Sequence, residues 1–148
     1  MTSDGAVQRT VRQILVAEDE AMNRKLIREV LELRGFQVAE ACDGEEAFQK
    51  AMACPPDLMI VDIRMPKLNG LELMDHMKRE PTLSGVPVVA LTALAMERDL
   101  EKAENSGFAG YVTKPFNMSK LYSVIEKCLQ DRALRKSAGG KAGADERI

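Results

Sequence analysis

The sequence of 148 residues contains no tryptophan, two tyrosines and four phenylalanines. Its core must therefore be built mainly from aliphatic side chains and from its nine methionines, which fill irregular gaps readily. No apolar run approaches the roughly 20 residues that a membrane-spanning helix requires. The first ten residues are polar and lack the apolar stretch of a signal peptide. We therefore expect a cytoplasmic protein that makes no contact with a membrane.

The chain also lacks an excess of charge of either sign. Its 21 basic and 23 acidic side chains leave a net charge of −2, without the basic surplus typical of nucleic-acid-binding proteins. The three cysteines, Cys42, Cys54 and Cys128, are odd in number and lack metal-ligand spacing. These features argue against a nucleic-acid partner and against a disulfide framework.

Short apolar runs alternate with amphipathic segments along most of the chain. The pattern predicts strands over 13–17, 36–41, 57–61, 86–91 and 110–113, and helices within 18–35, 43–53, 70–80, 93–107 and 117–130. Such alternation is typical of an α/β fold whose parallel sheet is covered by helices on both faces. We expect one domain over 12–130, a flexible segment over 1–11, and a disordered tail or truncated linker over 131–148, where apolar residues are scarce.

Charged and polar side chains follow four of the five predicted strands. In an open parallel sheet, ligands bind outside the carboxyl ends of the strands, so these side chains are expected to converge. Carboxylates gathered at one edge repel one another unless a cation joins them, and Mg²⁺ prefers oxygen ligands of this kind. A carboxylate can also attack phosphorus as a nucleophile, with a lysine neutralising the transferring oxygens. The residues concerned are Glu18, Asp19, Asp62, Thr92 and Lys114.

Four motifs, each following its own predicted strand, resemble one known family. ILVAEDE, LMIVDIRMPKLNG, ALTA and YVTKPF occur in this order and look like the receiver domain of two-component response regulators. The resemblance covers about residues 12 to 130. It implies a flavodoxin-like (βα)5 fold, a doubly wound five-stranded parallel sheet with strand order 2-1-3-4-5.

The resemblance also implies a metal site and a phosphoacceptor. Asp62 would accept a phosphoryl group from a histidine kinase or a histidine phosphotransfer protein. Asp19, with help from Glu18, would hold Mg²⁺ together with Asp62, and the backbone carbonyl of Arg64 would complete the protein ligands. Many family members carry two aspartates after the first strand, where this chain has Glu18 and Asp19, but glutamate is also common there.

Three further residues are given roles by the resemblance. Thr92 would hydrogen-bond the phosphoryl oxygen, Lys114 would pair with it, and Tyr111 would change rotamer as part of the switch. The surface formed by 93–105, 110–113 and 118–129 would then bind a downstream protein or a second copy of the chain.

The resemblance favours a stand-alone regulator of a bacterial phosphorelay. It would not be an enzyme in the usual sense, because Mg²⁺-dependent self-phosphorylation and autodephosphorylation are its only reactions. One alternative is a receiver excised from a larger hybrid kinase or multidomain regulator. A metal-dependent phosphatase with an aspartyl nucleophile would need a second aspartate at the position of Arg64, which argues against that class.

Overall fold

The computed structural model describes residues 12–92, 105–114 and 117–146, and for 134–146 it describes the backbone alone. The elements follow one another as β1 (Gln13–Ala17), α2 (Ala21–Leu33), β2 (Gln37–Ala41), α3 (Gly44–Ala53), β3 (Leu58–Asp62), α4 (Gly70–Lys78), β4 (Val88–Thr92), β5 (Gly110–Thr113) and α6 (Met118–Glu146). All five predicted strands are present, with bounds within about two residues of the prediction.

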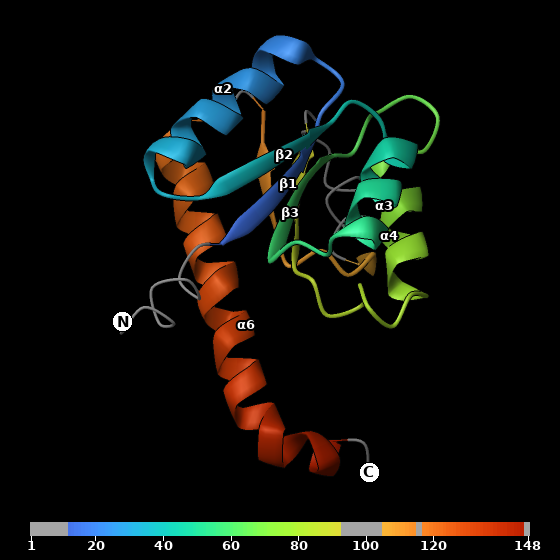
Figure 1. Ribbon diagram of the computed structural model, residues 1–148, viewed down its shortest axis with the longest axis vertical. Helices are drawn as coiled ribbons and strands as arrows, with labels where there is room; N and C mark the ends of the chain where they lie inside the picture. Colours follow the sequence, from blue (N-terminus) through green and yellow to red (C-terminus); the bar gives the residue numbers. More distant parts are fainter. Residues whose placement is uncertain (1–11, 93–104, 115–116, 147–148) are drawn as a thin grey trace.

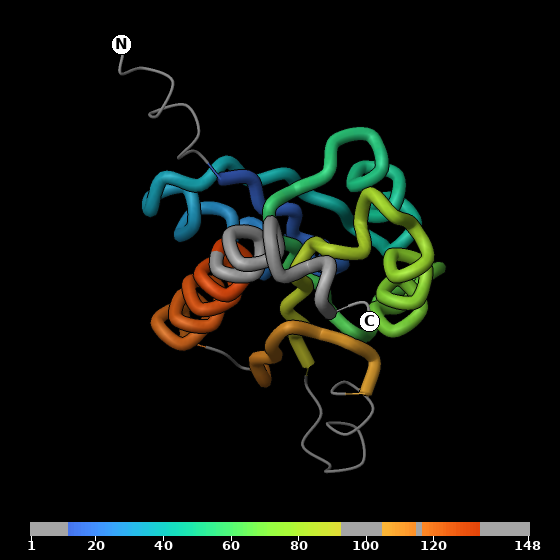
Figure 2. Tube along the Cα trace, turned by 90° about the horizontal axis from the view of Figure 1, so that it is seen from below, coloured from blue at the N-terminus to red at the C-terminus, as the bar shows by residue number. Residues whose placement is uncertain are grey.

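The five strands form one parallel sheet in the order β2-β1-β3-β4-β5, as predicted. Helices α2 and α6 lie together on one side of the sheet, and α3 and α4 lie together on the other (Figures 1 and 2). The register pairs Asp62 with Leu91 and Thr92 with Thr113, so the carboxyl ends of the three strands β3, β4 and β5 meet at one edge.

The core consists of two aliphatic layers, one on each face of the sheet. Successive residues of β1 alternate between them: Ile14 packs in the layer under α2 and α6, and Leu15 packs in the layer under α3 and α4. Strands β3 and β4 are buried at every position, which explains their continuous apolar runs. A buried strand that ends in an aspartate therefore carries that carboxylate to the rim of the core.

The loop between β3 and α4 is pressed closely against its neighbours. The N–H of Gly70 donates to the carbonyl of Ile63 at 2.9 Å, which folds the loop back onto the end of β3. A Cβ atom at Gly44 would lie 1.9 Å from the carbonyl oxygen of Leu68, so only glycine permits this approach. Lys67, with φ of 67°, adds an ion pair of 3.7 Å to Asp43.

The helix termini that flank these loops are capped as their sequences suggest. The Asp43 side chain accepts a hydrogen bond from the Glu46 N–H and so caps the start of α3. Asn69 and Glu72 form a reciprocal capping box at the start of α4. Both caps fix the direction in which the helices leave the loops beside Asp62.

The C-terminal helix is longer than the sequence pattern predicts. The prediction ends it at 130 and expects no regular structure afterwards, whereas the backbone of α6 is helical to Glu146. Alanine, arginine and lysine in this stretch have high intrinsic helix propensity. The stretch has too few apolar residues to show the periodic pattern from which a helix is predicted. The predicted flexible segment over 1–11 and most of the predicted helix over 93–107 lie outside the described residues. Within the described part of the chain, no helix is both long enough and apolar enough to span a membrane.

Candidate functional site

Two buried carboxylates and one lysine meet at the carboxyl edge of the sheet. Asp62 is the last residue of β3 and is 5% exposed, and Glu18, just after β1, is fully buried. Lys114, just after β5, places its Nζ 2.8 Å from Asp62 Oδ2 and 3.1 Å from Glu18 Oε1. A single ammonium group therefore serves two carboxylates.

The backbone around Asp62 holds its carboxylate in one orientation. Asp62 Oδ1 accepts a hydrogen bond of 3.0 Å from the N–H of Arg64. The N–H of Lys114 donates to the carbonyl of Thr92 at 2.6 Å, which fixes the start of the lysine side chain against the end of β4. Asp62 Oδ2 consequently faces Lys114, and Oδ1 faces the following loop.

Asp19 completes a cluster of three acids. Carboxylate oxygens of Glu18, Asp19 and Asp62 all lie within 4.8 Å of one another, with Asp19 exposed and the other two buried. Glu18 Oε1 is buried and has no hydrogen bond of acceptable geometry, although Lys114 Nζ is near it. The ion pair with Lys114 compensates this buried oxygen only in part, because the same ammonium group also pairs with Asp62. A hard cation with oxygen ligands fits this cluster, because it would satisfy that oxygen and relieve the repulsion.

The crowding of charge affects two pKa values. Burial raises the pKa of Glu18 to about 6, and the negative charge of Asp62 adds to the increase, although the Glu20 N–H and Lys114 oppose it. Burial alone would lower the pKa of Lys114, but its contacts with Asp62 and Glu18 outweigh this effect and raise the pKa. The lysine is therefore fully charged at neutral pH, and Glu18 takes up a proton at a higher pH than an ordinary glutamate does.

Thr92 and Tyr111 lie beside this cluster. Thr92, the last residue of β4, is 1% exposed and is adjacent to β3 in the sheet. Tyr111 pairs in register with Ala90 and is half-buried against Ala90 and Ile63, the residue that follows Asp62. The tyrosine thus lies one strand away from Thr92, within the layer that contacts the end of β3.

The structure brings together the acidic residues and the lysine that the sequence pattern groups, and it adds an arginine that the prediction did not include. Arg24 Nη1 donates to the carbonyl of Glu18 at 2.7 Å, and its Nε donates to Glu40 Oε1 at 2.9 Å. In the sequence, Arg24 is indistinguishable from the other charged residues on the solvated side of α2. For Arg64, the described contact involves its amide N–H, so the proposed role of its carbonyl rests on the family resemblance.

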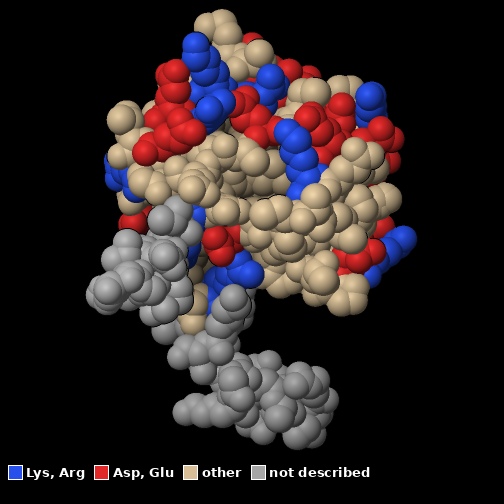
Figure 3. All heavy atoms as spheres, in the orientation of Figure 1, with Lys and Arg blue, Asp and Glu red and all other residues tan. Residues whose placement is uncertain are grey.

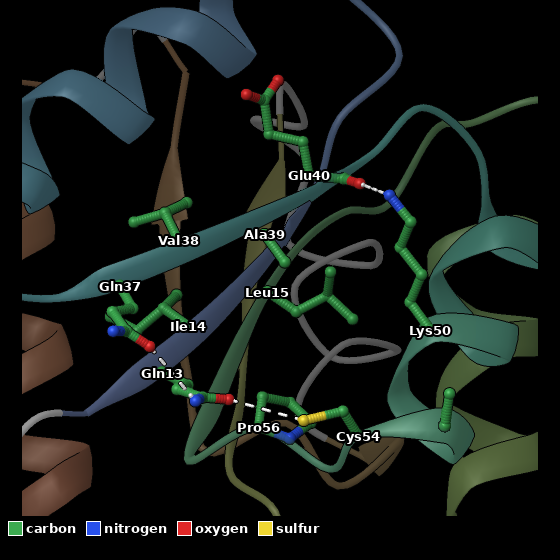
Figure 4. Close-up of a pocket in the computed structure, with 11 residues that line it drawn as sticks. Gln13, Ile14, Leu15, Gln37, Val38, Ala39, Glu40, Lys50, Cys54 and Pro56 are labelled. Carbon is green, nitrogen blue, oxygen red and sulfur yellow. Dashed lines mark hydrogen bonds between the residues drawn. The ribbon is translucent and has the colours of Figure 1, made fainter.

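A separate pocket of about 410 Å³ lies over β1 and β2 beside α3 (Figures 3 and 4). Its polar groups are paired with one another: Gln13 Nε2 donates to Gln37 Oε1 at 3.2 Å, and Lys50 Nζ donates to the carbonyl of Glu40 at 2.5 Å. Since it gathers no group of unpaired acids or bases, we assign the functional site to the carboxyl edge of the sheet.

The fold and the acidic edge together define a phospho-accepting signalling module, and comparison with known proteins agrees. The model of the response regulator receiver domain matches residues 14–126. The chain therefore belongs to the receiver-domain family of two-component signal transduction. Phosphorylation and a resulting change in partner binding are general in this family, whose members are not conventional enzymes.

Several individual proteins are similar to the chain. It is 32% identical over 120 residues to the polar-differentiation response regulator DivK of Brucella anthropi, covering 81% of this chain and 98% of DivK. The crystal structure of a putative response regulator from Chloroflexus aurantiacus has a TM-score of 0.78 at 26% identity, covering 82% of this chain and 99% of the other. The receiver domain of sensor histidine kinase PA1611 from Pseudomonas aeruginosa has a TM-score of 0.76 at 28% identity, with the same coverage, and is described with a magnesium ion coordinated in its active-site cleft.

Proposed function

We propose that Asp62 is the phosphoacceptor and that a histidine kinase or a histidine phosphotransfer protein is the donor. The observation that supports this most directly is the position of Asp62: a nearly buried carboxylate at a strand end, oriented by the Arg64 N–H and Lys114. An Asp62 oxygen would attack phosphorus as the bond from phosphorus to the donor nitrogen breaks, and the imidazole would depart with the bonding electrons. Lys114 would stay close to the new phosphoryl oxygens.

Glu18, Asp19 and Asp62, together with the carbonyl of Arg64, would hold Mg²⁺. The three clustered carboxylates and the unsatisfied Glu18 Oε1 support this ligand set. The ion would neutralise charge on the transferring oxygens. Asp19 and Asp62 would be the two direct carboxylate ligands, with Glu18 helping, so the ion would retain several waters and the site should bind it weakly. A receiver excised from a larger protein would use the same residues.

An experiment on the two aspartates at the ends of β3, Asp57 just before it and Asp62 as its last residue, tests the phosphoacceptor. Incubation with acetyl phosphate and Mg²⁺ should add one phosphoryl group, detected by intact-protein mass spectrometry. Asp62→Asn should abolish the addition, because an amide lacks the nucleophilic oxygen. Asp57→Asn is a matched control, since Asp57 precedes β3 at the opposite edge of the sheet, and it should be phosphorylated like the wild type. A phosphorylated Asp62→Asn protein would move the site elsewhere.

Thr92 and Tyr111 are proposed to transmit the phosphorylation state. Thr92 would hydrogen-bond a phosphoryl oxygen, and Tyr111 would move toward the space that Thr92 vacates. The packing of Tyr111 against Ile63 supports this, because Ile63 is bonded directly to Asp62. The surface of 93–105, 110–113 and 118–129 would then bind a downstream protein or a second copy of the chain in the cytoplasm. Amide chemical shifts should therefore change at Gly110–Thr113 upon phosphorylation, and changes confined to residues 62–69 would argue against the switch.

A further inference from the structure

Glu18 forms a hydrogen bond through every polar group except Oε1, which has only its ion pair with Lys114. Its N–H donates to the carbonyl of Ala41 at 3.1 Å, and its Oε2 accepts from the N–H of Glu20 at 3.1 Å. Its carbonyl accepts from Arg24 Nη1 at 2.7 Å. Oε1 alone remains available to a ligand beside Lys114. The direction of Oε1 therefore depends on how firmly the rest of the residue is held.

Arg24 connects this residue to two other elements of the fold. It extends from α2 with a side chain that is 18% exposed, and its Nε bonds Glu40 of β2 at 2.9 Å. The second oxygen of Glu40 bonds Arg28 Nη1 at 2.6 Å, one helical turn further along α2. Glu40 is adjacent to Ala41, whose carbonyl holds the Glu18 N–H. One guanidinium group thus joins the β1–α2 loop, α2 and the end of β2.

We propose that Arg24 is a positioning residue for the divalent-cation site of the proposed function. By holding the carbonyl of Glu18, it fixes the peptide unit that joins Glu18 to Asp19. Rotation of that peptide unit would turn the two successive carboxylates away from Asp62. Arg24 therefore acts through Glu18 and Asp19 and does not itself contact the ion.

Glu40 neutralises the positive charge that Arg24 brings close to the proposed cation site. A guanidinium group close to a cation site would repel a divalent ion, because both carry positive charge. The Glu40 carboxylate lies against Arg24 and compensates its charge. Glu40 also binds Arg28, so its carboxylate is held by two arginines of α2. The Arg24–Glu40 pair can thus supply orientation without adding net charge.

Arg28 provides a matched control, because it shares Glu40 with Arg24 but has no contact with Glu18 among the described interactions. Mg²⁺ titrations of Arg24→Ala, Arg24→Lys and Arg28→Ala would be followed by amide chemical shifts. Arg24→Ala should weaken Mg²⁺ binding about tenfold, the lower range for loss of a group that orients metal ligands. Arg28→Ala should bind within about twofold of the wild type, since exposed ion pairs contribute little.

A second readout separates positioning from a general loss of structure. The Mg²⁺ concentration for half-maximal phosphorylation by acetyl phosphate should rise about tenfold in Arg24→Ala, while the rate at saturating Mg²⁺ stays near that of the wild type. Arg24→Lys retains the charge but lacks the planar fork that reaches both partners, and should show a several-fold weakening. If Arg24→Ala does not fold, the Arg24→Lys protein decides the matter alone.

Wild-type Mg²⁺ affinity in either Arg24 variant would overturn the proposal. Equal weakening in Arg24→Ala and Arg28→Ala would also overturn it, since the effect would then arise from Glu40 or from overall charge. A wild-type protein that fails to bind Mg²⁺, or an Asp62→Asn protein that is still phosphorylated, would instead refute the proposed function.

Discussion

The two ends of β3 each carry an aspartate, and the two are stabilised in opposite ways. Asp57 lies just before the strand, where its N–H donates to the Gln13 carbonyl at 2.8 Å and its Oδ2 accepts from the Gln13 N–H at 2.8 Å. The Asp57 carbonyl accepts from Arg132 Nη1 at 2.6 Å. Asp62, at the other end, shares one lysine with the buried acid Glu18. The amino edge is paired for stability, whereas the carboxyl edge retains unsatisfied negative charge that a ligand can neutralise.

Removal of Lys114 should have the largest effect on this contrast. Lys114→Ala would leave Glu18 and Asp62 without a cation in a nearly buried site. Without metal, the free energy of unfolding should therefore fall by about 2–3 kcal/mol, slightly less than when one partner of a fully buried ion pair is removed. Chemical denaturation in EDTA measures this loss. Addition of Mg²⁺ should restore part of the stability, because the ion supplies positive charge to the same carboxylates. An equal loss with and without Mg²⁺ would show that the lysine acts only through packing.

A smaller effect is expected from Glu18, and its sign depends on pH. The pKa of Glu18 in the folded protein, about 6, exceeds its ordinary value of 4.5, so the folded state binds more protons between these values. Stability without metal should therefore fall as pH rises from 4.5 to 6 and stay at the lower value above that. Glu18→Gln removes the charge, so it should exceed the wild type in stability at pH 7 by on the order of 1–2 kcal/mol and approach it below pH 4.5.

Glu46 provides a control with the opposite slope. The hydrogen bond from the Cys42 N–H, and next that from the Cys42 side chain, lower the pKa of Glu46 to about 2. The contribution of Glu46 to stability is therefore present above pH 4.5 and is lost as the pH falls toward 2. Glu46→Gln should therefore be less stable than the wild type at neutral pH. If both Glu18→Gln and Glu46→Gln were less stable than the wild type at pH 7 in EDTA, the charge of Glu18 would not destabilise the folded protein.

The smallest effect should follow from a change at the amino edge. Arg132→Ala removes one hydrogen bond to the Asp57 carbonyl and an ion pair of 3.8 Å to its side chain, which is 40% exposed. The loss should stay below about 1 kcal/mol, because exposed pairs are screened by solvent. Mg²⁺ should not alter this value, as measured by the same denaturation curves. A loss as large as that of Lys114→Ala would remove the distinction between the two ends of the strand.

Much of the fold could be predicted because its signals are local. Buried strands appear as continuous apolar runs, and the parallel arrangement brings the residues after each strand to one edge, so Glu18, Asp62 and Lys114 could be grouped before their contacts were known. The role of Arg24 could not be predicted, because it depends on the path of a long side chain between α2 and β2. The contact of Lys67 with Asp43 is similarly non-local. The continuation of α6 beyond residue 130 could not be predicted, because helix-forming residues without an apolar face give no periodic signal.

The close approach of Gly44 to Leu68 restricts the choice of residue at position 44 more than at position 68. The atom that excludes a side chain at position 44 is the carbonyl oxygen of Leu68, which every amino acid possesses. Replacement of the Leu68 side chain cannot create room for a larger residue at position 44. During divergence of this sequence, position 68 could therefore change with only a loss of packing, whereas Gly44 could change only if the main chain of a whole loop moved with it.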